Sequence, residues 1–296
     1  MDNPRHIARD LSYATSAQTR AGRVFIRVAE NVTGRVGLIK RASGYEGEVA
    51  AGRDFWEVMT DRYGLTLDVV GGSLESIPSE GPCVVLANHP YGILDGLMMG
   101  RILAERRKEY RILAHRVFRN APDLERIILP VSFEETKEAM KGNLETRKEA
   151  LRFLADGGAI GIFPGGTVST APRPFARPID PFWRSFTAKM IVKSDAKVVP
   201  IYFEGANSRL FQMASHIHST LRMALLIKEF KARTDEPVRI VIGEPIARNK
   251  IEVHAKDPRA MMDFLRAETY KLSPKPLKNF DYGYEFEDRF RHRKAS

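Results

Sequence analysis

Short apolar runs rich in β-branched residues alternate with longer segments of helical periodicity from about residue 80 onward. The apolar runs predict strands at 83–88, 110–115, 126–131, 158–163, 197–203 and 237–242. The segments between and after them predict helices at 94–108, 134–155, 181–194, 209–231 and 258–272. This alternation is typical of an α/β protein, so we expect a mixed, largely parallel sheet flanked by helices.

Glycine and proline mark some of the boundaries. Gly157 follows the helix that ends at Asp156, which predicts a left-handed helix cap. Asp257 precedes Pro258, the order expected of an N-cap acceptor and a proline at the first helical position. Pro200 lies inside a predicted strand. Because proline is tolerated only at an edge or a bulge, we expect that strand to border the sheet or the site.

Residues 1–75 are predicted to form an N-terminal helical segment ahead of a main domain at 76–273. Between Arg20 and Lys40, apolar side chains alternate with basic ones. This pattern fits either an amphipathic segment that contacts a membrane or helices packed on the main domain with a solvated basic face. The tail at 274–296 is predicted to be irregular. Its basic end at 289–294 is expected either to contact the phosphates of lipid or RNA or to be solvated.

Composition and charge narrow the class of protein. With 296 residues, 43% of them apolar, the chain suffices for one large α/β domain or two small ones. The 47 basic and 37 acidic residues give a net charge of +10, which favours nucleic acid, anionic lipid headgroups or an acidic carrier protein as partners. A basic soluble protein without such a partner fits equally well.

The cellular compartment is predicted from what the sequence lacks. Cys83 is the only cysteine, which excludes an intrachain disulfide and indicates a reducing compartment. The N-terminus has no long apolar run, so we expect no cleaved secretory signal. No apolar stretch reaches the roughly 18 residues of a spanning helix. We therefore predict a cytoplasmic protein, peripherally associated with the inner face of the membrane.

The most informative stretch is Asn88-His89-Pro90, followed by Asp95 six positions after the histidine. Six helical positions would separate the two side chains by about 120°, so a straight helix would keep them apart. Pro90 biases the histidine towards an extended conformation and Gly92 permits a turn, so the chain bends between them. We interpret His89 and Asp95 as a catalytic dyad. The alternative is a structural histidine at a strand end, with an aspartate that caps the next helix.

A second candidate segment, Pro164-Gly165-Gly166-Thr167, follows the strand predicted at 158–163. Two successive glycines let backbone N–H groups approach a ligand closely, and the hydroxyls of Thr167 and Ser169 add donors. The loop suits an anion or an oxyanion, although Pro-Gly-Gly also forms ordinary turns. It is not a nucleotide P-loop, because the Gly-Lys-Ser ending is absent.

Arg173 and Arg177 lie shortly after this loop. Their guanidinium groups would bind a phosphate or carboxylate headgroup if they face the site. They are equally well explained as solvated surface residues.

Three segments in this order resemble motifs one, three and four of the glycerolipid (lysophospholipid) acyltransferase family, over about residues 80–245. The segments are Asn88-His89 with Asp95, Phe163-Pro164-Gly165-Gly166-Thr167, and Val199-Pro200-Ile201. The combination of Asn-His-Pro and a nearby Asp with Phe-Pro-x-Gly-Thr is much more specific than either motif alone.

This sequence departs from the family pattern at three places. Five residues separate His89 from Asp95, where the family commonly has four, and the family has Glu and Arg where Gly165 and Val168 stand. The longer spacing and residues 207–211 resemble a branch of lyso-ornithine-lipid and hemolysin-like acyltransferases. Residues 128–133, which match the second motif, contain no arginine, so no role is transferred from that motif. The acceptor therefore need not carry a glycerol-phosphate headgroup.

The resemblance implies an acyltransferase-like fold and an O-acyltransferase of membrane lipid biosynthesis. The enzyme would move a fatty acyl group from acyl-CoA or acyl carrier protein to the hydroxyl of a lyso-lipid, without a covalent acyl-enzyme. The histidine would be the general base, the aspartate its orienting acid, and loop N–H groups the oxyanion donors. The residues expected to bind substrate are Asn88, Pro164, Gly165, Gly166, Thr167, Arg173 and Arg177. The thioester is a co-substrate, and no other cofactor is expected.

Two functions of other classes remain open. One is a hydrolase that uses the same dyad to cleave acyl esters or thioesters with water, and the other is a non-catalytic basic module that binds membrane or RNA. No strand interleaves basic and aromatic residues, so nucleic acid is not an expected partner. His216 and His218 point to different faces of a predicted helix, and His115 and His254 lack partners in the pattern, so no metal site is expected.

Overall fold

The computed structural model describes residues 12–14, 17, 19–115, 122–131, 136–277 and 281–286. In this part of the chain, one sheet has the strand order β1-β7-β6-β2-β5-β3-β4. The strands are β1 (Thr66–Gly71), β2 (Cys83–Ala87), β3 (Tyr110–His115), β4 (Ile128–Val131), β5 (Ala159–Ile162), β6 (Lys197–Phe203) and β7 (Pro237–Ile242). All neighbouring strands run parallel except β6 and β7, so the mixed, largely parallel sheet is confirmed.

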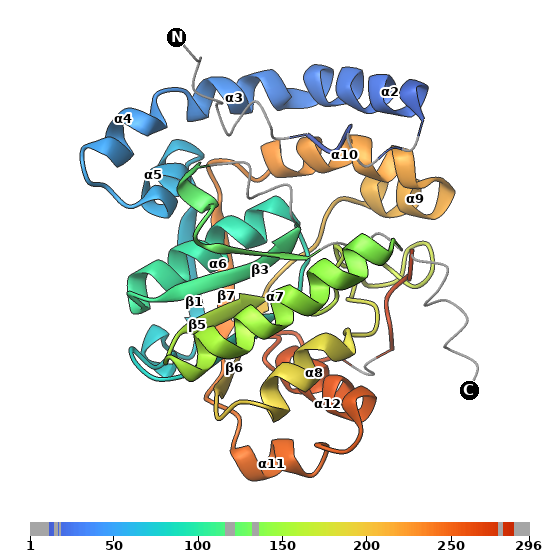
Figure 1. Ribbon diagram of the computed structural model, residues 1–296. Helices are drawn as coiled ribbons and strands as arrows, with labels where there is room; N and C mark the ends of the chain where they lie inside the picture. The colour runs from blue at the N-terminus through green and yellow to red at the C-terminus, as the bar shows by residue number, and fades with distance from the viewer. Residues whose placement is uncertain are drawn as a thin grey trace.

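Helices cover both faces of this sheet (Figure 1). They are α2 (Arg20–Glu30), α3 (Val36–Ala42), α4 (Tyr45–Ala50), α5 (Phe55–Arg62), α6 (Ile93–Arg106), α7 (Lys137–Ala155), α8 (Ser185–Val192), α9 (Arg209–Ile217), α10 (Ser219–Lys231), α11 (Arg248–Glu252) and α12 (Pro258–Lys271). Alternate residues of β2 point to opposite faces. Val85 joins a core with α3 to α6 and α10, whereas Val84 and Leu86 join a core with α7, α8, α11 and α12.

One strand was missed by the sequence analysis, because β1 falls in the segment predicted to be helical. Its residues are only partly buried, and Asp68 interrupts its apolar pattern. The strand forms an edge of the sheet, where it pairs in parallel with β7. An edge strand with one solvated side carries a weak apolar signal, which explains the miss.

Of the two positions expected for the strand that contains Pro200, the edge of the sheet was wrong. It lies in β6, between β2 and β7, and pairs with Leu86 of β2. The pairing of β6 with β7 begins one residue later, at Ile201 opposite Ile242, and resumes with the bridge between Val198 and Ile246. The three residue steps from Val198 to Ile201 on β6 therefore face the four steps from Ile242 to Ile246. The missing proline N–H coincides with this extra residue, which is the bulge that the sequence allowed.

The helix predicted at 209–231 is two helices. His218 adopts an extended conformation (φ −161°) between α9 and α10, and its Nδ1 accepts a hydrogen bond from Thr220 N at 3.0 Å. The histidine is therefore the N-cap of α10. The periodicity of the apolar residues continues across this break, so the sequence pattern alone joined the two helices.

Other boundaries follow the predicted capping chemistry. Gly157 has a positive φ of 87° after α7, and Gly158 N donates to Phe153 O at 2.9 Å, which closes the helix end. Asp257 accepts hydrogen bonds from the N–H groups of Arg259 and Ala260 at the start of α12. The basic end at 289–294 lies outside the described residues. Within the described ranges, no helix is both long enough and apolar enough to span a bilayer.

Candidate active site

The segments that follow β2, β5 and β6 converge at the carboxyl end of the sheet. These three strands are adjacent, with β2 in the middle, and they run in the same direction. Their continuations, which begin at Asn88, Phe163 and Glu204, therefore meet at one edge. This is where open α/β sheets ordinarily place their ligands.

The turn between β2 and α6 brings His89 and Asp95 together. Gly92 has φ 91°, a conformation that favours glycine, and α6 begins directly after it. Asp95 is in the first turn of this helix and is completely buried. Its Oδ2 accepts hydrogen bonds from Tyr91 N at 2.8 Å and Gly92 N at 2.9 Å, and lies 2.9 Å from His89 Nδ1.

The imidazole of His89 is held on one side and open on the other. The ring N–H does not point straight at the carboxylate oxygen, an alignment that unliganded sites commonly show and that tightens when substrate binds. The ring stacks on Phe163 with centroids 4.3 Å apart. The side chain is 18% exposed, and Nε2 has no partner among the described residues. That nitrogen is available to a substrate.

The charge of Asp95 depends on the donors around it. Burial raises the pKa of this carboxyl above its ordinary value, whereas the contacts with His89, Tyr91 N and Gly92 N oppose the rise. Removal of any of these donors would favour the protonated acid. The neighbouring phenol of Tyr91, whose pKa burial raises to about 12, is a neutral donor to Glu204 O at 2.9 Å.

The loop after β5 lies against this turn. Ser169 N donates to His89 O at 2.7 Å, which fixes the loop relative to the dyad. Gly166 N already donates to Phe163 O at 3.0 Å, so it is the least available of the expected oxyanion donors. No acceptor among the described residues bonds Gly165 N or Thr167 N. These two groups are the candidate donors for an oxyanion.

Asp180 is a buried carboxylate that the sequence analysis missed. Its Oδ1 accepts hydrogen bonds from His89 N at 3.2 Å and from the hydroxyl of Ser169, and its Oδ2 accepts from Trp183 Nε1 at 2.8 Å. It therefore ties the dyad turn to the loop after β5. Its setting in an apolar stretch, between Ile179 and Pro181, is the sequence signal that pointed to burial.

Arg222 of α10 is the second missed residue. It is fully buried, and its guanidinium donates to Thr167 Oγ1, Val168 O and Thr170 Oγ1 of the loop. Its signal in the sequence was a charge at a position that shares a helical face with Leu226. The predicted strand-end motifs gave no reason to look on this helix.

Asn88 contacts the fold rather than open space. Its Nδ2 donates to Phe203 O at 2.9 Å, and its Oδ1 accepts from Phe203 N at 2.7 Å. Arg177 is also engaged, with Tyr202, Ser273 and the carbonyl of Lys275. Arg173 is exposed. The structure thus brings Pro164, Gly165, Gly166 and Thr167 to the dyad, and bonds Asn88 and Arg177 to other parts of the domain.

The remaining candidate groups lie apart from the dyad. Cys83 is buried inside β2, and burial raises the pKa of its thiol to about 11, so it stays protonated at neutral pH. His216 Nε2 lies 3.0 Å from Ala171 O, and His254 stacks on Phe264. Across the described ranges, no three His, Cys, Asp or Glu side chains are placed to hold a metal ion.

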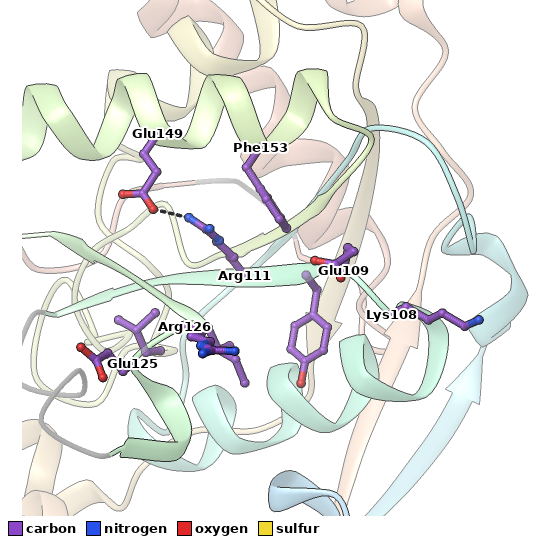
Figure 2. A pocket seen from close by; sticks show the side chains of 10 residues that line it. Lys108, Glu109, Arg111, Glu125, Arg126, Glu149 and Phe153 are labelled. Carbon is purple, nitrogen blue, oxygen red and sulfur yellow. Dashed lines mark hydrogen bonds and ion pairs between the residues drawn. The ribbon is translucent and has the colours of Figure 1, made fainter.

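A cavity of about 800 Å³ opens at the other end of the sheet, where β3 begins and α7 ends. Figure 2 shows Arg111 directed at Glu149, with Phe153 beside it. The charged residues that line the cavity are Lys108, Glu109, Arg111, Glu125, Arg126 and Glu149. Because β3 and β2 run in the same direction, this balanced set of charges is remote from the dyad.

An imidazole held by a buried acid, beside backbone N–H groups that have no acceptor among the described residues, is an arrangement used by acid–base enzymes. The comparison with known proteins names the family. Residues 47–278 match a family model described as acyltransferase. This is most of the chain, so the protein belongs to this acyltransferase family and the resemblance seen in the motifs is confirmed.

Two relatives are lyso-glycine lipid O-acyltransferases. The protein from Phocaeicola vulgatus is 25% identical over 228 residues, which cover 75% of this chain and 78% of the relative. The one from Bacteroides thetaiotaomicron is 23% identical over 234 residues, 77% of this chain and 82% of the relative. Among solved structures, the 1-acyl-sn-glycerophosphate acyltransferase PlsC from Thermotoga maritima matches with a TM-score of 0.44 and 16% identity, over 86% of this chain and 98% of that chain.

The two hydrogen bonds between the Asn88 side chain and the Phe203 backbone predict that Asn88 stabilises the fold. Asn88→Ala leaves a buried backbone N–H and C=O without partners, so the free energy of unfolding should fall by about 2–4 kcal/mol. Asn249→Ala, at an exposed position of α11, is the matched control and should change it by less than about 0.5 kcal/mol. Urea denaturation followed by circular dichroism measures both. Equal stability of the two variants would show that the amide does not join β2 to β6.

Proposed function

We propose that this acyltransferase moves a fatty acyl group from a thioester to the hydroxyl of a lyso-lipid, with His89 as the general base. The contact between His89 Nδ1 and Asp95 Oδ2 at 2.9 Å carries the proposal. An alcohol attacks a carbonyl slowly unless a base takes its proton in the same step. Nε2 of the imidazole, open and partly exposed, is the atom that takes it.

The proposed step conserves atoms and charge. The acceptor oxygen bonds to the thioester carbonyl carbon as its proton passes to Nε2, and the carbonyl oxygen becomes an oxyanion. The buried carboxylate of Asp95 stabilises the imidazolium that forms. When the tetrahedral intermediate collapses, the C–S bond breaks and the imidazolium returns the proton to the thiolate. The products are an ester and a thiol, and the enzyme is unchanged.

The backbone N–H groups of Gly165 and Thr167 are the proposed hydrogen-bond donors to the oxyanion. Both lie on the loop that Ser169 joins to His89, and neither has an acceptor among the described residues. Donors fixed before the reaction cost no reorganisation when charge develops on the carbonyl oxygen. Gly166 then serves the loop itself, through its hydrogen bond to Phe163 O.

The donor is an acyl-CoA or an acyl carrier protein, and the acceptor is a lyso-lipid with a free hydroxyl. The two relatives named above are lyso-glycine lipid O-acyltransferases. A lyso-lipid with an amino-acid headgroup therefore comes first in an acceptor panel, ahead of glycerol-phosphate lipids. The net charge of +10 supports attraction to anionic lipid and to an acidic carrier protein.

We also propose a peripheral membrane contact through α2, α3 and α9. These helices lie on one side of the sheet, next to α10 (Figure 1). Ile26 buries one face of α2 against Ala224 of α10, whereas apolar side chains on the other face stay exposed. The exposed apolar set is called the apolar stripe below. It is Val24, Phe25, Val28, Val32 and Val36 on α2, α3 and the π-helical segment Asn31–Arg35 between them, with Leu210, Met213 and Ile217 on α9.

The stripe supports an anionic lipid surface as the partner. Val32 is 81% exposed and Ile217 is 74% exposed, which is costly in water and favourable in the interfacial region of a bilayer. Arg20 and Arg23 at the start of α2 and Lys40 at the end of α3 are exposed beside these residues. Apolar burial combined with flanking basic residues is the pattern of interfacial helices.

Substitution of the dyad tests the reaction. His89→Ala removes the base and should lower the rate of acyl transfer by about 10²–10⁴-fold. Asp95→Asn keeps the shape but not the charge, and should lower it by on the order of 10²-fold or more. The assay follows a labelled acyl thioester into a panel of lyso-lipids, and counts released fatty acid to separate transfer from hydrolysis.

His254→Ala serves as the control, because this histidine lies after α11 and stacks on Phe264. It should keep full activity. Full activity of His89→Ala, or fatty acid as the sole product in the presence of every lyso-lipid, would contradict the proposed transfer.

Charge introduced in the apolar stripe tests the membrane contact. The double variant Val28→Asp/Val32→Asp should weaken binding to vesicles that contain anionic lipid by at least about tenfold, because it removes two apolar contacts and adds repulsion. Leu144→Asp, at an exposed apolar position of α7, should bind as the native protein does. Co-sedimentation with vesicles measures all three proteins. Unchanged binding of the double variant would place the membrane contact elsewhere.

A further inference from the structure

Arg222 is a buried arginine that contacts the loop of the candidate active site from its inner side. Its side chain is 1% exposed. Nη1 donates to Thr170 Oγ1 at 2.6 Å and to Ser215 Oγ at 2.9 Å. Nη2 donates to Thr167 Oγ1 at 3.2 Å and to Val168 O at 2.9 Å. Both terminal nitrogens are thus used, and three of their four acceptors belong to residues 167–170.

Among the described residues, no carboxylate neutralises the charge of this guanidinium. All four hydrogen-bond acceptors are uncharged oxygens, and no carboxylate in the described part of the chain forms an ion pair with Arg222. The rings of Phe211 and Phe286 cover the group, with centroids 4.8 and 4.0 Å from Cζ. A buried charge without a counter-ion is expensive to maintain. Such a group calls for a functional explanation.

The neighbouring phenol does not act as the counter-ion. Burial raises the pKa of Tyr13 well above its ordinary value, so the phenol is neutral at physiological pH. Burial also lowers the pKa of the Arg222 guanidinium, to about 9, which still leaves it protonated at neutral pH. A full positive charge is therefore held against the inner side of the loop.

The loop that Arg222 contacts differs from the family pattern. The resemblance places an arginine at residue 168 and a glutamate at residue 165, where this chain has valine and glycine. Val168 instead packs with Phe211 and Leu226, and a Cβ on Gly165 would lie 3.3 Å from an oxygen of Asp180. The guanidinium that reaches the loop in this protein comes from α10.

We propose that Arg222 is a positioning residue for acyl transfer, which fixes residues 167–170 from behind and supplies the positive charge that faces the oxyanion. The proposal rests on the function proposed above, because the oxyanion forms at that loop. The group acts through the loop and does not touch the substrate. Its effect is strongest when negative charge develops, so it raises kcat more than it lowers KM.

Substitutions of Arg222 that keep or remove the charge test this role. Arg222→Gln keeps a polar side chain without charge and should lower kcat by on the order of 10²-fold, with KM for the lyso-lipid little changed. Arg222→Lys keeps an ionisable amine with fewer hydrogen bonds, and should recover most of that loss when the amine is protonated. Steady-state kinetics are measured with one acyl thioester and one lyso-lipid, and Tm is measured for each variant.

Arg107 provides a matched control for the loss of a buried arginine. Its guanidinium donates to the carbonyls of Pro78, Gly81 and Gly157 at the end of the sheet remote from the dyad. Arg107→Gln should therefore lower Tm as Arg222→Gln does, without a comparable loss of kcat. Equal kcat losses in these two variants would show that Arg222 acts only through the stability of the fold, and would overturn the proposal.

Three further outcomes separate this inference from the proposed function. If Arg222→Lys is as inactive as Arg222→Gln although its amine is protonated, the charge has no role and the inference fails. If Arg222→Gln raises KM for the lyso-lipid and leaves kcat unchanged, the residue binds the acceptor, which also overturns the inference. If His89→Ala retains activity, the proposed dyad fails, whatever the Arg222 variants show.

Discussion

The complete burial of the Asp95 carboxylate is the constraint on which the candidate site depends. A buried carboxylate is costly unless donors satisfy it, and here they converge on Oδ2. Two of them, Tyr91 N and Gly92 N, exist because the chain turns at the glycine and starts α6 there. The third contact is His89 Nδ1. The turn that satisfies Asp95 Oδ2 therefore also orients the imidazole, and stability and chemistry share one set of contacts.

Asp180 and Arg222, which carry opposite charges, both bind the neighbouring loop. Asp180 binds the hydroxyl of Ser169 and the backbone of His89, whereas Arg222 binds Thr167, Val168 and Thr170. Charge-assisted hydrogen bonds are stronger than neutral ones and fix backbone more firmly. The loop thus presents unused N–H groups in a defined place. Preorganised donors of this kind contribute most when an oxyanion forms.

The central strands and the dyad were predictable because local chemistry determines them. A continuous apolar run predicts β2, and Pro90 and Gly92 predict the bend that brings the two side chains together. The sequence did not predict the other role of Asn88, because Phe203, its partner, is 115 residues away in the chain. Arg222 was missed for the same reason. Its contacts depend on how α10 packs, which no local pattern encodes.

Solvated elements were the other source of error. β1 is an edge strand that shows little apolar alternation, and His218 interrupts a continuous helical pattern through its backbone conformation. Both features depend on tertiary context, which overrides propensity. In α2, the sequence left open whether the amphipathic segment packs on the domain or contacts a membrane. The structure shows that one face packs and that apolar side chains remain exposed on the other.

In the proposed reaction the acceptor hydroxyl attacks the thioester directly, assisted by His89, and the enzyme carries no acyl group. The most direct measurement combines initial rates, with both substrates varied, and intact mass spectrometry of the protein after incubation with the thioester alone. Direct attack predicts intersecting double-reciprocal lines and an unmodified mass. Parallel lines together with a mass increase of one acyl group would contradict it, because they would show a covalent acyl-enzyme.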